Sequence, residues 1–239
     1  MKLSVIIPAH NEEKRLPDTL RAVLRQDHPD FEVIVIDNAS TDRTADVARG
    51  FNVIVIHEGN KGTLWACEAG RKAASGEVIV RTDADCLPEP DWLSRGAKHL
   101  NDPRVVGATG PYDYHDANPS FRSLSLFTQR YIYRHINIIF QKARIGSMLI
   151  EGNSFMRAQT LEDIGGFDTR FVFYGDGTDT AKRMSRFGHI VFDTGLTMKT
   201  SARRFKSQGF LTVTAKYLYH FFKTSFTKVR PPSKNQSQT

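Results

Sequence analysis

Two aspartates one residue apart, Asp83 and Asp85, close the stretch E-V-I-V-R-T-D-A-D at residues 77–85. The apolar residues 78–80 before them predict a buried strand, and strands of this kind bring functional residues to their carboxyl ends. Carboxylate oxygens in an Asp-x-Asp pattern suit Mg²⁺ or Mn²⁺, which proteins often bind with one or two carboxylates and the phosphates of a substrate. The pattern therefore predicts a metal-bridged diphosphate, with a solvated acidic turn as the structural alternative.

Two further loops that follow predicted strands carry candidate nucleoside contacts. P-A-H-N-E-E occupies residues 8–13, and D-N-A-S-T-D-R-T occupies residues 37–44. The Asp37 carboxylate can accept a hydrogen bond from a nucleobase N–H, and the Glu12 carboxylate can accept hydrogen bonds from ribose hydroxyls. Capping of turns and helix ends is the alternative role for such residues, and we prefer it for Asp42.

A third loop, N-K-G at residues 60–62, adds a cation and a flexible backbone after another predicted strand. The Lys61 ammonium group can face a phosphate there, and an ordinary surface lysine is the equally open alternative. Together, the three loops and the acidic pair predict a pocket for a nucleoside, its phosphates and a divalent cation.

Alternating apolar strands and amphipathic helices must position these loops. Strand, helix, strand and helix at this spacing predict parallel βαβ units, whose strands end at one common edge. The predicted strands are 3–7, 31–36, 53–56, 78–80 and 190–192, and the predicted helices are 15–26, 44–49, 64–74 and 180–186. The aromatic-rich residues 110–150 show no such pattern, and ordinary packing explains their aromatics as well as an acceptor site does.

The size and composition of the chain fit a single α/β domain, since it has 239 residues of which 40% are hydrophobic. Cys67 and Cys86 are too few for a disulfide framework and lack metal-site spacing, so we expect packing residues in a reducing compartment. The first apolar run is too short for a signal peptide, and no run approaches the ~18 apolar residues of a membrane-spanning helix. These features predict a cytoplasmic protein.

The formal net charge of +7 predicts an anionic partner. No nucleic-acid-binding module or basic recognition helix is recognisable, which argues against nucleic acid. Residues 206–230 alternate aromatics with lysines and predict a helix. Such a helix can lie at the inner face of an anionic membrane with its lysines near lipid phosphates, or it can pack on the domain. The polar tail 231–239 predicts disorder.

Taken together, the ordered motifs resemble the inverting family-2 glycosyltransferases of the GT-A fold. The resemblance rests on V-I-I-P-A-H-N-E-E (5–13), V-I-V-I-D-N-A-S-T-D-R-T (33–44), N-K-G (60–62), A-S-G-E-V-I-V-R-T-D-A-D (74–85) and G-G-F-D (165–168). It implies an α/β fold with a mostly parallel central sheet, a Rossmann-like βαβ nucleotide-binding half and helices on both faces. We expect one domain over 1–205, with a nucleotide-sugar-binding half at 1–110 and an acceptor and catalytic half at 111–205.

The resemblance also implies roles for individual residues. A sugar would pass from a UDP- or GDP-linked donor to the hydroxyl of a saccharide or lipid-linked acceptor, as in the synthesis of cell-envelope glycans or glycolipids. Asp83 and Asp85 would flank Mn²⁺ or Mg²⁺ and the diphosphate. Arg203 or Arg204 would contact the diphosphate, and a solvated or membrane-facing basic patch is the alternative. The nucleotide sugar would contact Pro8, Ala9, Asn11, Glu12, Asp37, Lys61, Asp83 and Ala84.

The catalytic base is the point where the chain departs from the family pattern. An inverting transferase needs a base that deprotonates the acceptor hydroxyl as it attacks the anomeric carbon. The family usually places it in G-E-D-x-D after G-G-F-D, whereas residues 175–179 read G-D-G-T-D. Either Asp176 is the base beside Gly177, or Asp179 is, or the protein binds its donor and transfers poorly. We favour Asp176, because Asp179 suits the cap of the predicted helix at 180–186.

Two other function classes stay open. A nucleotide-sugar-binding protein of this fold, impaired in catalysis, would keep Asp37 and the acidic pair but lack a competent base. A nucleotidyltransferase would use a similar crevice and metal, but a glycine-rich basic loop would be expected after its first strand. This chain has P-A-H-N-E-E at that place. The binding protein is therefore the main alternative to an enzyme.

Overall fold

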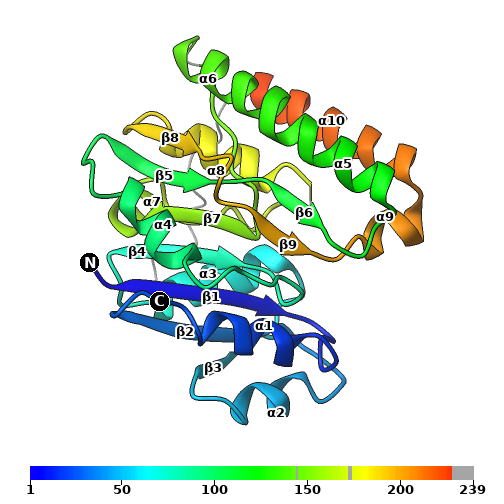
Figure 1. Ribbon diagram of the computed structural model, residues 1–239. Coiled ribbons are helices and arrows are strands. Elements are labelled where there is room, and N and C mark those ends of the chain that lie inside the picture. Colours follow the sequence, from blue (N-terminus) through cyan, green and yellow to red (C-terminus); the bar gives the residue numbers. More distant parts are fainter. Residues whose placement is uncertain (144, 172–173, 228–239) are drawn as a thin grey trace.

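The computed structural model describes residues 1–143, 145–171 and 174–227. A seven-stranded sheet forms its centre, made of β1 (Leu3–Ala9), β2 (Phe31–Asp37), β3 (Ile54–His57), β4 (Val78–Thr82), β5 (Val105–Thr109), β7 (Asn153–Arg157) and β8 (His189–Phe192). The strand order is β3-β2-β1-β4-β7-β5-β8 (Figure 1). β7 runs antiparallel to β4 and β5, and the other neighbouring strands are parallel. The predicted mostly parallel sheet is confirmed.

Helices cover both faces of this sheet, as predicted (Figure 1). One face packs on α1 (Leu16–Val23), α2 (Thr44–Arg49) and α4 (Trp92–His99), and the other packs on α3 (Thr63–Ala73), α7 (Ala158–Asp163) and α8 (Asp176–Met184). The two cores follow the alternation of side chains along a strand: Val5 and Ile7 belong to the first core, and Ile6 belongs to the second. Burial on both faces explains the nearly unbroken apolar run of β1.

The predicted elements of the first half lie within a few residues of the observed ones, but the predicted helix 180–186 is wrong at its start. α8 begins at Asp176, because Gly175 adopts a positive φ of 90° and turns the chain directly before it. Asp179 therefore lies within the first turn of α8 and does not cap it. This shift brings the side chain of Asp176 to the amino end of the helix.

A further helical layer lies beside the sheet, and most of it falls within residues 110–150, where the sequence showed no clear pattern. It consists of α5 (Pro119–Phe127), the π-helical segment η1 (Thr128–Tyr133) and α6 (Arg134–Lys142) in direct succession, with α10 (Phe210–Phe226) running alongside (Figure 1). Aromatic rings join the two helical segments: the centroids of Phe121 and Phe210 are 5.1 Å apart, and those of Phe140 and Phe221 are 5.4 Å apart. A small sheet of β6 (Tyr112–Tyr114) and β9 (Met198–Thr200) leads into this layer.

The predicted helix 206–230 is divided into two in the structure. α9 (Arg203–Gln208) and α10 are separated by Gly209, which adopts a positive φ of 83°. Residues 228–230 and the predicted disordered tail 231–239 lie outside the described residues. Among the helices that are described, none is both long enough and apolar enough to cross a membrane.

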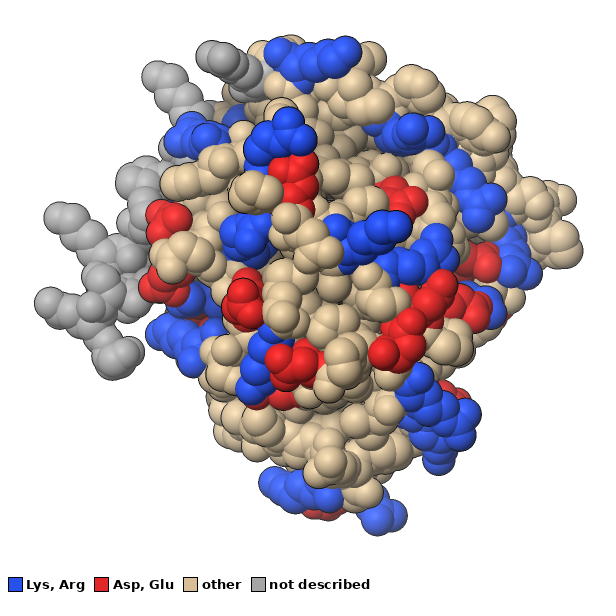
Figure 2. Space-filling view, turned by 60° about the vertical axis from the view of Figure 1, so that its left-hand side comes forward, with Lys and Arg blue, Asp and Glu red and all other residues tan. Residues whose placement is uncertain are grey.

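The charged side chains are dispersed over the face shown in Figure 2, where lysines and arginines lie among aspartates and glutamates. The net charge of +7 is thus not gathered into one continuous basic patch on this face. Both cysteines, Cys67 and Cys86, are free and buried, as expected for packing residues.

Candidate functional site

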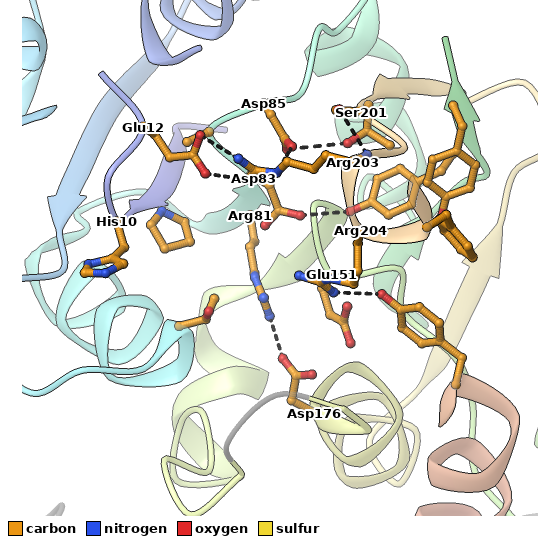
Figure 3. Close-up of a pocket in the computed structure, with 18 of the residues that line it drawn as sticks. His10, Glu12, Arg81, Asp83, Asp85, Glu151, Asp176, Ser201, Arg203 and Arg204 are labelled. Carbon is orange, nitrogen blue, oxygen red and sulfur yellow. Dashed lines mark hydrogen bonds and ion pairs between the residues drawn. The ribbon is translucent and has the colours of Figure 1, made fainter. Parts of the chain in front are cut away.

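A pocket of about 190 Å³ opens at the carboxyl ends of β1 and β4. Because β1 and β4 are parallel neighbours, the loops that follow them lie together at one edge of the sheet. The segments before β7, α8 and α9 complete the wall of the pocket. Most of its polar lining is labelled in Figure 3. The lining includes Pro8, His10, Glu12, Arg81, Asp83, Ala84, Asp85, Tyr112, Glu151, Asp176, Arg203 and Arg204. We call this cavity the strand-end pocket.

Asp83 and Asp85 are both in this pocket and hold different partners. The Tyr112 hydroxyl donates to Asp83 Oδ2 at 3.1 Å. Asp85 Oδ2 lies 3.1 Å from Arg203 Nε, and the Thr200 hydroxyl lies 3.5 Å from Asp85 Oδ1. Burial and then the negative charge of Asp83 raise the pKa of Asp85 to about 6. The two carboxylates therefore repel one another, and a cation between them would be favourable.

The donor set fits a cation that is shared with a ligand. Within the described ranges, no group of three or more histidine, cysteine or acidic side chains is arranged to hold a metal ion. Asp83 and Asp85 supply two carboxylates, and Mg²⁺ and Mn²⁺ commonly complete such a set with water and substrate phosphates. The arrangement suits an ion bridged to a diphosphate, not a closed metal site made by protein alone.

Arg203 links two acidic side chains across the pocket. Its guanidinium pairs with both carboxylate oxygens of Glu12, with Nη1 3.0 Å from Oε2, and also with Asp85 (Figure 3). Arg204 lines the same pocket and donates from Nη1 to the Tyr217 hydroxyl at 3.0 Å. Two guanidinium groups on the wall provide the positive charge that an anionic ligand requires.

Several predicted nucleotide contacts lie outside the lining of this pocket. Asp37, at the end of β2, is buried, and its carboxylate contacts His57 Nδ1 at 3.1 Å. Asn11 has a positive φ of 56° and accepts from the Thr41 backbone N–H at 2.8 Å, so it joins the loops after β1 and β2. Ala9 is buried at the end of β1, and Lys61 is exposed in the loop after β3. Their contact with a nucleotide stays a prediction.

Asp176 lies in the pocket and is held by a buried arginine. Arg81 Nη1 is 3.0 Å from Asp176 Oδ2, and each of the two side chains is only 6% exposed (Figure 3). In the described structure, the buried Nε of Arg81 has no hydrogen-bond partner. The ion pair places the positive charge of Arg81 beside the buried Asp176 carboxylate and fixes the position of that carboxylate in the pocket.

Asp179, the second sequence candidate for the base, is not brought to the pocket. Its carboxylate accepts from Arg183 Nε at 2.7 Å. The Nη1 of Arg183 in turn donates to the carbonyl oxygens of Ile164 and Gly166, at 3.0 and 2.8 Å. This chain of contacts fastens α8 to the G-G-F-D segment, so the geometry gives Asp179 a structural position.

Glu151 is a pocket residue that the sequence reasoning missed. Its carboxyl group is hydrogen-bonded to that of Asp176, and Oε1 lies 3.4 Å from the Gly177 backbone N–H. Burial, followed by the charge of Asp176, raises the pKa of Glu151 well above its usual range. Because β7 is antiparallel to β4, its beginning lies at the edge where the parallel strands end. An acid two residues before β7 was the available signal, and it is weak because β7 reads N-S-F-M-R and has no apolar run.

A second, mostly apolar cavity of about 280 Å³ adjoins the strand-end pocket. It lies between α5–η1 and α10, and we call it the apolar groove. Its lining includes Phe121, Leu124, Phe210, Leu218 and Phe222. The two cavities share Tyr112, Tyr114, Glu151, Phe205 and Tyr217 in their linings. A molecule in the groove would therefore present one end to the strand-end pocket.

Comparison with known proteins identifies relatives of the same kind. The family model described as glycosyl transferase family 2 matches residues 4–165. The chain is 30% identical over 184 residues to glycosyltransferase AglE of Haloferax volcanii, which covers 73% of this chain and 58% of AglE. It is 28% identical over 206 residues to a dolichyl N-acetyl-alpha-D-glucosaminyl phosphate 3-beta-D-2,3-diacetamido-2,3-dideoxy-beta-D-glucuronosyltransferase of Methanococcus voltae, covering 80% of this chain and 56% of that protein. The chain thus spans little more than half the length of these relatives.

A solved structure shares the fold over nearly the whole chain. The mannosyltransferase PcManGT of Pyrobaculum calidifontis, solved in complex with GDP-Man and Mn²⁺, superposes with a TM-score of 0.75 at 23% sequence identity. The match covers 98% of this chain and 67% of PcManGT. The predicted GT-A fold is confirmed by this likeness.

Proposed function

The chain belongs to glycosyl transferase family 2, and from this membership we propose that it transfers a sugar from a nucleoside-diphosphate sugar to an acceptor hydroxyl, with inversion at the anomeric carbon. The observation that carries the proposal is the strand-end pocket, which is lined by Asp83 and Asp85 together with Arg203 and Arg204. Acidic and basic groups in one pocket suit a diphosphate that bridges a cation and guanidinium groups.

The donor is proposed to be UDP- or GDP-linked and to lie along the ends of β1, β2 and β4. Pro8, Glu12 and Ala84 line the pocket itself. Asp37 is proposed to accept the nucleobase N–H, with Ala9, Asn11 and Lys61 toward the nucleoside and phosphates. PcManGT, whose structure contains GDP-Man and Mn²⁺, supports a donor and metal of this kind.

Mn²⁺ or Mg²⁺ is proposed to be held by Asp83 and Asp85. When bound, the cation would neutralise the negative charge that develops on the departing nucleoside diphosphate. Tyr112 keeps Asp83 in place through its hydroxyl. Burial and the charge of Asp83 raise the pKa of Tyr112 well above its usual range, so the phenol stays a hydrogen-bond donor.

The acceptor is proposed to enter from the apolar groove, and a lipid-linked saccharide of a cell-envelope glycan or glycolipid suits its lining. Five lining residues shared with the strand-end pocket give such a molecule a path to the donor sugar. The Methanococcus voltae relative, whose name specifies a dolichyl phosphate-linked sugar, supports this choice. A free saccharide would use the polar end of the same path.

A thermal-shift screen tests the proposed donor site. In the presence of Mn²⁺, UDP or GDP at ~100 times its Kd should raise the Tm by roughly 5–10 °C, because it binds only the folded state. The same nucleotide should give a much smaller shift with EDTA, and CMP should give little shift with or without metal. Stabilisation by a nucleotide sugar without any turnover would instead favour a binding protein, and no stabilisation by either nucleotide would contradict the proposal.

Contact of α10 with an anionic membrane is a further part of this proposal. Leu211 and Phe226 are 79% and 67% exposed, and Lys216 and Lys223 lie on the same helix. We expect the L211E/F226E variant to co-sediment ~10-fold less with vesicles of phosphatidylcholine and phosphatidylglycerol, because it loses two apolar anchors. The matched control is I54E, which replaces an apolar residue that is 45% exposed on β3. Equal sedimentation of both variants and the unmodified chain would contradict the membrane contact.

A further inference from the structure

Five acidic side chains line the strand-end pocket, and four of them are held by basic or hydroxyl groups. Glu12 and Asp85 pair with Arg203, Asp83 accepts from the Tyr112 hydroxyl, and Asp176 pairs with Arg81. The fifth is Glu151, which contacts the Asp176 carboxyl group and the Gly177 backbone N–H. Glu151 is thus the acid least committed to a positive charge.

Glu151 also lies at the junction of the two cavities. Its side chain belongs to the lining of the strand-end pocket and to that of the apolar groove. None of the other four acids lines the groove among the residues described for it. An acceptor hydroxyl that arrives through the groove therefore meets Glu151 at the boundary of the donor site.

The absence of a side chain at Gly177 makes room for this arrangement. A Cβ atom at position 177 would lie 2.5 Å from the Leu149 carbonyl oxygen and 3.2 Å from Glu151 Oε1. The backbone before β7 therefore occupies the space that a side chain from the first turn of α8 would need. The acid at this point of the pocket comes from the loop at Glu151, and α8 contributes a backbone N–H to it.

We propose that Glu151 is the general base of the transfer, an inference that rests on the proposed function. The acceptor oxygen forms a bond to the anomeric carbon as the bond from that carbon to the diphosphate oxygen breaks. The hydroxyl proton passes to the Glu151 carboxylate, and the electron pair of the broken bond leaves with the nucleoside diphosphate. Asp176, held by Arg81, positions Glu151 and is not itself the proton acceptor.

The environment of Glu151 supports this role. Burial and the neighbouring Asp176 raise its pKa, which makes its ionised form a stronger proton acceptor than an ordinary surface carboxylate. Asp176 differs, because it is held in an ion pair with the Arg81 guanidinium 3.0 Å away. The two acids thus have separate roles: Glu151 accepts the proton, and Asp176 holds Glu151 in place.

The test compares E151Q with D176N and with E162Q, a matched loss of charge at an exposed glutamate of α7. Release of nucleoside diphosphate is measured with Mn²⁺ and the nucleotide sugar that the unmodified chain turns over, first with water and then with sodium azide as acceptor. Azide carries no proton to remove, so it bypasses the base. We expect E151Q to lose ~100-fold or more with water, to keep its donor-induced thermal shift, and to form a glycosyl azide of inverted configuration with azide.

The outcomes separate this inference from the proposed function. E162Q should behave like the unmodified chain, and D176N should lose less than E151Q while keeping azide transfer. Near-normal turnover of E151Q, or a ~100-fold loss confined to D176N with rescue by azide, would overturn the assignment of Glu151. A loss in E151Q that azide does not restore would also overturn it, since the defect would then lie in donor binding or folding. An unmodified chain that releases no diphosphate would contradict the proposed function itself.

Discussion

Replacing Asp85 with asparagine should lower metal-dependent donor turnover about 100-fold or more. The amide keeps the size of the side chain but removes an anionic oxygen from the pair that would hold the cation. Loss of the cation removes several kcal/mol of charge stabilisation from the departing diphosphate, and each ~1.4 kcal/mol is tenfold in rate. D83N should behave similarly, because Asp83 is the other carboxylate of the pair and Tyr112 fixes its position.

The measurement for both variants is release of nucleoside diphosphate over a titration of Mn²⁺. The control is D46N, which changes an exposed aspartate of α2 that pairs with Arg49 away from the pocket. We expect D46N to match the unmodified chain. Unchanged turnover and metal dependence in both D83N and D85N would rule out the acidic pair as the metal site.

Replacing Arg81 with methionine should destabilise the fold by about 3–5 kcal/mol, since it leaves a buried carboxylate without its partner. Arg81 and Asp176 are each 6% exposed, and Glu151 lies beside Asp176, so the variant would bury two acids together. Unfolding by urea, followed by circular dichroism, gives the free energy of unfolding of the variant and of the unmodified chain.

Two further variants show whether this cost comes from the buried pair. R81M/D176L removes both charges and should recover most of the lost stability, because a buried ion pair is often replaceable by apolar groups. R21M breaks the exposed pair of Arg21 with Asp18 and should change the free energy of unfolding by no more than ~1 kcal/mol. A loss for R81M no larger than that for R21M would show that Asp176 does not depend on Arg81.

The first half of the fold was predictable because most of its strands, β1, β2 and β4, are largely buried on both faces. Such strands form short apolar runs, and the helices between them keep a 3.6-residue period that marks their buried side. The position of the site follows from the predicted strands, since the residues that come after parallel strands lie at one edge of the sheet. Asp83 and Asp85 were found in this way, and the structure places both in one pocket with Glu12.

The second half was less predictable because its positions depend on contacts distant in sequence. β7 inserts antiparallel between β4 and β5, and this reversal brings Glu151 to the pocket. A strand pattern alone does not reveal the direction of a strand in a sheet. The layer of α5, η1, α6 and α10 keeps many apolar side chains exposed, so its apolar residues do not mark a single buried side. Its role depends on the apolar groove, which exists only once these helices are packed.

The two sequence candidates for the catalytic base also could not be placed without the structure. Asp176 and Asp179 are three residues apart at the start of α8, yet Asp176 faces the pocket and Asp179 pairs with Arg183. Their different directions follow from helical geometry, but the start of α8 must be known to tell which of the two faces the pocket. That start depends on the turn at Gly175. The assigned contacts of Asp37 and Lys61 with a nucleotide stay predictions.

The most direct test of the central claim is a transfer reaction followed by NMR, with a panel of UDP- and GDP-linked sugars and Mg²⁺. We predict that one donor releases its nucleoside diphosphate, that the transferred sugar has the opposite anomeric configuration, and that EDTA stops the reaction. Release with retained configuration, or release at an unchanged rate in EDTA, would contradict a metal-dependent inverting transferase. No release from any donor, despite metal-dependent binding of UDP or GDP, would leave a nucleotide-sugar-binding protein as the correct account.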